Sequence, residues 1–179
     1  CYTLVGNAAW LAATREERIA VIRAFATNSS LSAVVMANCE ISDALAVAWA
    51  ESLRTNRSLT SLNLESNSIG SSGIEALADA LRCDDGGAPQ LKELKLANQY
   101  VVAGQSSEEA LAEALAHCPS LTKLTLQHRS LRARDIVTRI LTRNADAERQ
   151  ARKLGLGGGS SSATTTTTTT TTSPSSVAQ

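Results

Sequence analysis

The sequence predicts an α/β solenoid, in which short parallel strands line one face and helices cover the other. An apolar pattern with offsets of three, five and ten residues recurs five times, starting from Cys1, Leu31, Leu59, Leu91 and Leu121. Successive starts are 30, 28, 32 and 30 residues apart, and a helical pattern lies between them. A repeat of nearly constant length indicates one stacked array and not several globular domains.

The clearest copy reads Leu59-x-x-Leu62-x-Leu64-x-x-Asn67-x-Ile69, which is a leucine-rich repeat pattern. Its alternating leucines predict a strand with one buried face. Cys39 occupies the Asn position of the second copy, where we expect it to face inward and bond the neighbouring turn. Repeats of about 30 residues with a full helix indicate the ribonuclease-inhibitor-like class of these arrays. The copy from Cys1 is degraded, and a chain that opens on Cys favours removal of upstream repeats.

Three Ser/Thr-x-x-Glu segments predict helix starts as capping boxes, at Thr14–Glu17, Ser72–Glu75 and Ser106–Glu109. Apolar residues at helical spacing follow each start, so each helix is expected to pack one face on the strands. The last helix is predicted to begin near Asp135 and to turn polar after Leu141, as a terminal cap would. Residues 84–88 interrupt the spacing before Leu91 and predict an inserted loop.

These patterns place a leucine-rich repeat domain at residues 1–153, with a terminal polar helix that ends at 153. Residues 154–179 are Gly/Ser/Thr-rich, and we expect them to be disordered because they offer little to bury. No apolar run approaches the roughly 18 residues that a membrane span needs, so no membrane association is expected. The four cysteines are far apart and resemble reduced thiols of a reducing compartment.

The sequence offers no constellation for catalysis. Its two histidines, His117 and His128, lack a Ser, Cys or carboxylate at a spacing that suggests a nucleophile and its base. No glycine-rich segment has the setting of a phosphate loop, so no enzyme, cofactor, metal or small-molecule substrate is expected. Nucleic acid is not expected as a partner either, because the basic last repeat has no aromatic residue after Tyr100 for base stacking. Protein binding remains.

The net charge of zero hides an asymmetry along the array. Residues 1–120 carry eight Lys/Arg against fourteen Asp/Glu, a net of −6, and residues 121–179 carry nine against three, a net of +6. Sequence order is spatial order in a solenoid, so one end should be acidic and the other basic. The basic end is a candidate for docking an acidic protein surface, although solvated surface charge without a partner gives the same pattern.

Several segments resemble the tropomodulin and leiomodin family. Residues 63–70, followed by Gly73-Ile74 and Ala80-Leu81, are similar to that family's Asn-Val-Glu-Ser-Asn-Phe-Ile, Gly-Ile, Ala-Leu segment. Residues 94–99 look like its next strand, which also closes on Asn-Gln, and residues 144–153 look like its basic terminal helix. The resemblance covers roughly residues 14–153.

The resemblance implies a non-catalytic domain that binds actin, caps or regulates filament pointed ends and is cytoplasmic and cytoskeleton-associated. Tropomyosin would bind only through family segments that this sequence does not contain. The implied partner-binding residues lie in the strand–helix turns and the basic cap: Glu65, Ser66, Lys95, Asn98, Gln99, Arg132, Arg134, Arg149, Arg152 and Lys153. The repeat pattern alone leaves two alternatives, a generic interaction array of an immune-type receptor or scaffold and an accessory to a small GTPase.

The fold prediction makes Leu64 a core residue, because its repeat can bury this side chain only by stacking on its neighbours. The substitution Leu64→Ala should lower the free energy of unfolding by about 2–5 kcal/mol, measured by urea titration. A loss below about 0.5 kcal/mol would contradict this position in the core.

Overall fold

A computed structural model describes residues 1–82 and 90–155. Five short strands form one parallel sheet in sequence order. They are β1 (Tyr2–Thr3), β2 (Ala33–Val35), β3 (Ser61–Asn63), β4 (Glu93–Lys95) and β5 (Lys123–Thr125). Each strand coincides with a predicted repeat, which confirms the solenoid. The predicted loop at residues 84–88 lies outside the described residues, as does the predicted tail from residue 156 onward.

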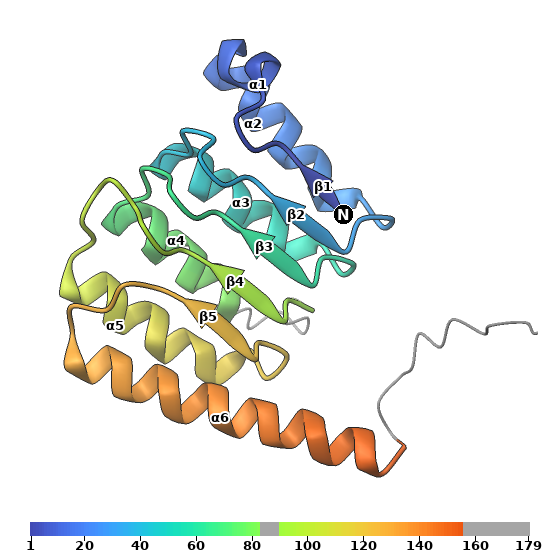
Figure 1. Ribbon diagram of the computed structural model, residues 1–179, viewed down its shortest axis with the longest axis vertical. Helices are drawn as coiled ribbons and strands as arrows, with labels where there is room; N and C mark the ends of the chain where they lie inside the picture. The colour runs from blue at the N-terminus through green and yellow to red at the C-terminus, as the bar shows by residue number, and fades with distance from the viewer. Residues whose placement is uncertain (83–89, 156–179) are drawn as a thin grey trace, which may run out of the picture.

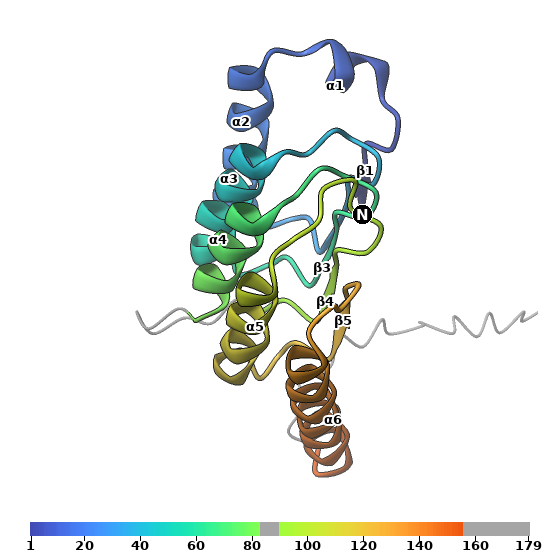
Figure 2. The same ribbon diagram turned by 90° about the vertical axis from the view of Figure 1, so that its left-hand side faces the viewer.

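Six helices connect and cover the strands in the described part of the chain. They are α1 (Ala8–Ala12), α2 (Arg15–Ala24), α3 (Asp43–Thr55), α4 (Ser71–Arg82), α5 (Gln105–Ala114) and α6 (Leu131–Lys153), with 3₁₀ turns η1 (Phe25–Thr27) and η2 (Leu115–His117). Figure 1 shows the strands and helices stacked in the same order, and Figure 2 shows α2 to α5 as one layer on one side of the sheet. Each strand ends at the edge where the next helix begins.

The core lies between these layers and follows the predicted apolar positions. The central strand residues align across the sheet, Val34 with Leu62, Leu62 with Leu94 and Leu94 with Leu124. Val34, Leu62 and Leu94 are fully buried. Trp49 of α3 is buried as well and stacks on Phe25, with ring centroids 5.1 Å apart.

The apolar position at offset ten does not follow the prediction in three repeats. Leu11, Val101 and Leu131 are 39%, 46% and 75% exposed. In the first repeat the neighbouring Trp10 is buried instead, and its indole Nε1 donates to the carbonyl of Cys39 at 2.7 Å. An apolar residue at the right spacing therefore does not by itself determine which side chain the turn directs inward.

In the second and third repeats a buried side chain at the Asn position links the turn to the preceding one. The Asn67 amide donates from Nδ2 to the carbonyls of Met36 and Leu64, and its Oδ1 accepts from the N–H groups of Cys39 and Ile41. In the second repeat the Cys39 thiol donates to the carbonyl of Leu4 at 3.2 Å, as predicted. Burial raises the pKa of this thiol, so it keeps the proton that it donates.

Only one of the three predicted capping boxes forms. Thr14 and Glu17 cap α2 as predicted, but Ser72 and Ser106 lie inside α4 and α5, so those two predictions are wrong. Side chains of the preceding repeat take over this role. Asp43 of α3 accepts from the N–H groups of Gly70 and Gly73.

The same arrangement recurs further along the array. The Ser71 hydroxyl of α4 accepts from the N–H of Gly104, the residue before α5, at 2.8 Å. Glu108 of α5 accepts from the N–H groups of Arg129 and Ser130, just before α6. Each of these helix starts is therefore held by its neighbour, which fixes the spacing between repeats.

The last helix begins at Leu131 and not near Asp135. Ser130 is its N-cap and accepts from the N–H of Ala133, a start signal that the polar Arg-rich segment concealed. Beyond Leu141 the helix is not uniformly solvated, because Asn144 is buried and donates to the carbonyls of Cys118 and Leu121. The helix thus covers the last apolar layer and also satisfies its turn.

Substitutions at Gly73 and Ser72 test whether α4 is capped by Asp43, as observed, or by Ser72, as predicted from the sequence. A Cβ at Gly73 would lie 2.6 Å from Ile69 Cγ2 and 2.7 Å from Asp43 Oδ1, so Gly73→Ala must push these groups apart. We expect it to lower the free energy of unfolding by about 1–3 kcal/mol in a urea titration. Ser72→Ala, at an exposed neighbour, should change it by less than about 0.5 kcal/mol. If Ser72→Ala lowered the free energy of unfolding more than Gly73→Ala, the predicted capping box at Ser72 would be supported instead.

Candidate protein-binding surface

The predicted partner-binding residues lie in two separate regions. Five are in or just after β3 and β4, and five are in α6. Arg132 and Arg134 begin α6 at the edge where the strands end, whereas Arg149, Arg152 and Lys153 are at its far end, beyond the sheet (Figure 1). A helix of 23 residues is roughly 35 Å long, so these two groups of cations cannot act as one site.

Ser66 and Asn98 occupy the same turn position in successive repeats. Both have left-handed backbone conformations, with φ of 55° and 59°. The N–H of Ser66 donates to the carbonyl of Ala97, and Asn98 Oδ1 accepts from Gln127 Nε2 at 3.1 Å. These two residues are placed at the exposed edge by the turn that ends each strand.

Gln99 has a different environment. Its Nε2 donates to the carbonyls of Leu64 and Leu96, and its Oε1 accepts from the N–H of Ile69. Gln99 therefore stands where Asn67 stands in the preceding repeat. Both polar atoms of its amide are bonded to the backbone of the repeats. Partner binding by Gln99 therefore stays a prediction.

Glu65 and Lys95 lie on the face of the sheet away from the helices. Glu65 Oε2 accepts from Asn63 Nδ2, and Lys95 Nζ is 3.8 Å from Glu93 Oε1. Ser61 donates to the same Glu93 side chain at 3.0 Å. The face is thus polar around β3 and β4, where the carboxylates of Glu65 and Glu93 outnumber the single ammonium of Lys95.

The basic residues of α6 differ in how far they are neutralised. Arg132 pairs with Glu109 and Glu113, whereas Arg149 and Arg152 pair with acidic residues of their own helix. Among the described residues Arg134 and Lys153 form no ion pair. The helix as a whole keeps a basic surplus, since Asp135, Asp146 and Glu148 are its only acidic residues.

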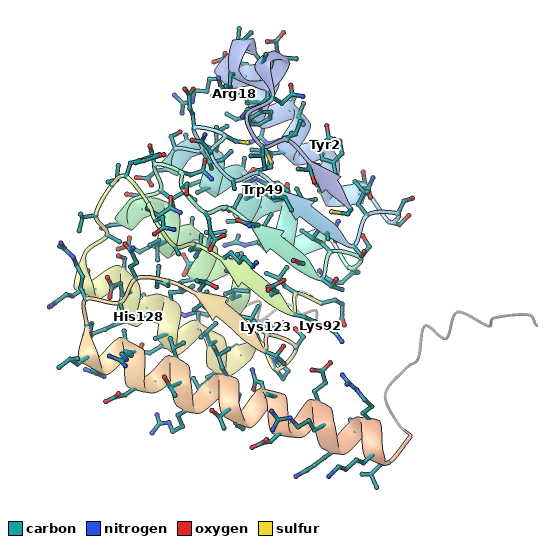
Figure 3. The ribbon with its side chains drawn as sticks, in the orientation of Figure 1. Tyr2, Arg18, Trp49, Lys92, Lys123 and His128 are labelled. Carbon is teal, nitrogen blue, oxygen red and sulfur yellow. The ribbon has the colours of Figure 1, made fainter. Side chains whose placement is uncertain are left out.

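Glu148 joins the far half of α6 to the sheet. Its Oε1 is 2.9 Å from Lys92 Nζ, just before β4, and 3.3 Å from Arg152. The hydrogen bond from Lys92 is the main reason why the pKa of this carboxyl is below its usual value. Figure 3 shows Lys92 and Lys123 together at the starts of their strands, next to this helix.

Four apolar residues at the strand–helix edge are exposed, which the sequence analysis did not predict. Tyr100, Val101, Val102 and Leu131 are 71%, 46%, 58% and 75% exposed. The signal was present, because the repeat requires only one apolar residue after Gln99 and the chain has three in succession. A hollow of about 110 Å³ lies beside Val101 and Val102.

The described residues contain no group of three or more His, Cys, Asp or Glu side chains that could hold a metal ion. His128, at the turn between β5 and α6 (Figure 3), has a buried Nδ1 without a partner among them. Burial lowers the pKa of His128, while Glu108 opposes that shift and Arg134 adds to it. Over the same residues, no helix has the length and apolarity to cross a membrane.

A stack of parallel strand–helix repeats with a polar edge and a basic terminal helix defines a leucine-rich repeat protein of the ribonuclease-inhibitor-like class. The sequence matches the TMOD/LMOD leucine-rich domain over residues 12–147. The chain belongs to the tropomodulin/leiomodin family. The sequence left open a tropomodulin-like domain, a generic interaction array and an accessory to a small GTPase. The family match selects the first of these classes.

Individual relatives agree with the family match. Human leiomodin-3 is 33% identical over 136 residues, which are 76% of this chain and 24% of that protein. Bovine tropomodulin-4 is 34% identical over 130 residues, which are 73% of this chain and 36% of that protein. The chain thus spans about a quarter to a third of the length of these relatives.

Two solved structures share the fold. The leiomodin-1 actin-binding site 2 superposes with a TM-score of 0.75 and 31% identity, covering 86% of this chain and 84% of that one. The tropomodulin C-terminal domain from Caenorhabditis elegans gives a TM-score of 0.71 and 28% identity, covering 82% and 85%.

His128 should make the last repeat sensitive to mild acid. A base whose pKa is lower in the folded than in the unfolded chain binds fewer protons when folded, so stability is fully present above the unfolded pKa of about 6.5 and falls below it. The free energy of unfolding should therefore drop between pH 7.5 and pH 5.5, and His128→Gln should reduce that drop. The exposed His117→Gln serves as control. An unchanged pH dependence in His128→Gln would contradict the assignment.

Proposed function

We propose that this chain is a non-catalytic actin-binding domain that caps or regulates the pointed ends of actin filaments. The observation that carries the proposal is the structural match to the leiomodin-1 actin-binding site 2 over 86% of the chain, together with family membership. That neighbour is an actin-binding site, and most of its fold is shared with this chain.

The distribution of charge supports an electrostatic contribution to this binding. Residues 121–179 carry nine Lys/Arg against three Asp/Glu, and actin is acidic overall. The outward cations at the far end of α6 are positioned for long-range attraction, which raises the association rate and fixes orientation more than it raises affinity. The turns that carry Ser66 and Asn98, and the strand that carries Lys95, would supply the closer contacts.

Two further properties belong to the same proposal. We infer that the protein acts without catalysis, since its polar side chains are used for capping and turn stabilisation, and that it resides with the cytoskeleton in the cytoplasm. We also propose residues 1–153 as the unit that binds, because α6 closes the array at Lys153.

Reversal of the far cations tests the electrostatic part. The triple variant Arg149→Glu, Arg152→Glu and Lys153→Glu should inhibit pointed-end elongation about tenfold less well than wild type, because exposed pairs contribute roughly 0.2–1 kcal/mol each. The assay uses barbed-end-blocked filaments and micromolar protein, and higher salt should narrow the difference.

A second triple reversal, at the exposed Arg15, Arg54 and Arg57, changes the net charge by the same amount elsewhere on the molecule and serves as control. If wild type and both variants inhibited elongation equally, the cations at the far end of α6 would have no role in actin binding. Absence of inhibition by wild type, even when fused to an upstream actin-binding segment, would overturn actin binding itself.

A further inference from the structure

An exposed apolar loop interrupts the polar edge of the array between β4 and α5. Tyr100, Val101 and Val102, which we call the apolar edge loop, are 71%, 46% and 58% exposed. Scattered apolar residues on a surface need no explanation, but three in succession on one turn form a contiguous patch. None of the three is required by the core, which the repeat already fills with Leu91, Leu94 and Leu96.

The loop is held in place at both ends. The N–H of Tyr100 donates to the carbonyl of Asn67 at 2.7 Å, and the N–H of Gly104 donates to the Ser71 hydroxyl at 2.8 Å. Between these bonds Val101 lies close against Gly70, where an added Cβ would be 3.2 Å from Val101 Cγ1. Tyr100 and Val102 are therefore presented on a fixed backbone, which lowers the entropy lost when a partner binds.

A hollow opens beside the loop, between the fourth and fifth repeats. It has a volume of about 110 Å³, and its apolar lining includes Ile74, Leu96, Val101, Val102 and Leu126. An apolar cavity of about 150 Å³ accommodates a benzene molecule, so this hollow has the size of one aliphatic side chain. The chain itself provides no side chain to fill it among the described residues.

The surroundings of the hollow favour negative charge. Arg129 lines the hollow, and Arg134 follows in α6; both are exposed, and neither forms an ion pair with a described residue. Glu108 also lines the hollow, but its side chain is 2% exposed and already accepts two backbone N–H groups. The helices α5 and α6 also begin at this edge, which adds the positive ends of their dipoles.

We propose that this hollow is an anchor site, which receives an aliphatic or aromatic side chain from an acidic segment of the protein partner. The apolar edge loop covers the inserted side chain, and Arg129 and Arg134 pair with the carboxylates that flank it. This inference rests on the proposed actin binding and adds an apolar centre to it. Buried apolar anchors with a charged rim typically carry most of the binding energy of an interface.

The test compares two exposed valines in the pointed-end elongation assay. Val102→Ser removes apolar area from the anchor site, and Val47→Ser removes the same group from α3, where the side chain is 38% exposed. We expect Val102→Ser combined with Tyr100→Ala to raise the half-inhibitory concentration about tenfold, and Val47→Ser to leave it unchanged. Increased salt should not narrow this difference, since the contact is apolar.

Ala103→Leu provides a second variant, because it partly fills the hollow without removing apolar surface. It should also weaken inhibition, provided that urea titration shows an unchanged fold. Inhibition by wild type with equal potency for the Tyr100/Val102 variant would overturn the anchor site and leave actin binding intact. Absence of inhibition by wild type would instead remove the proposed function on which the site rests.

Discussion

The stack depends on two amide side chains, one buried and one half-buried, that each bond the backbone of two neighbouring turns at once. Asn67 joins its own turn to that of the preceding repeat, and Gln99 does the same one repeat later. Without these bonds, the N–H and C=O groups of the turns that follow the short strands would be buried without a partner. Because these bonds cross from one repeat to the next, the turns of the second and third repeats are completed by a side chain of the following repeat.

The helix layer follows the same rule. Asp43, Ser71 and Glu108 each bond a helix start or the residue before it in the following repeat. Helix starts fixed in this way align along one edge, together with the turns that carry Ser66 and Asn98. The edge is rigid because its polar groups are already engaged, and residues that are not needed for the stack become available for contacts.

The two ends of α6 give this family member two kinds of surface. Its start belongs to the edge, near the apolar edge loop and the hollow, and its far end extends beyond the sheet as a basic arm tied to Lys92 through Glu148. An apolar centre can hold a partner, whereas exposed cations mainly attract and orient it. The separation of the two along one long helix suits a partner with an extended surface.

The sequence by itself determined the repeat length, the five strands, the inward stripe of each helix and the inward thiol of Cys39, because these follow from apolar periodicity within each repeat and from its recurrence along the chain. The cap of α2 was also determined, since Thr14 and Glu17 are local. Only the tertiary structure decided that Asp43 and Glu108 replace Ser72 and Ser106 at helix starts, that Gln99 is part of the fold, and that Val101 and Leu131 face solvent. These outcomes depend on atoms about 30 residues away in sequence, which stacking brings within hydrogen-bond distance and which no local pattern encodes.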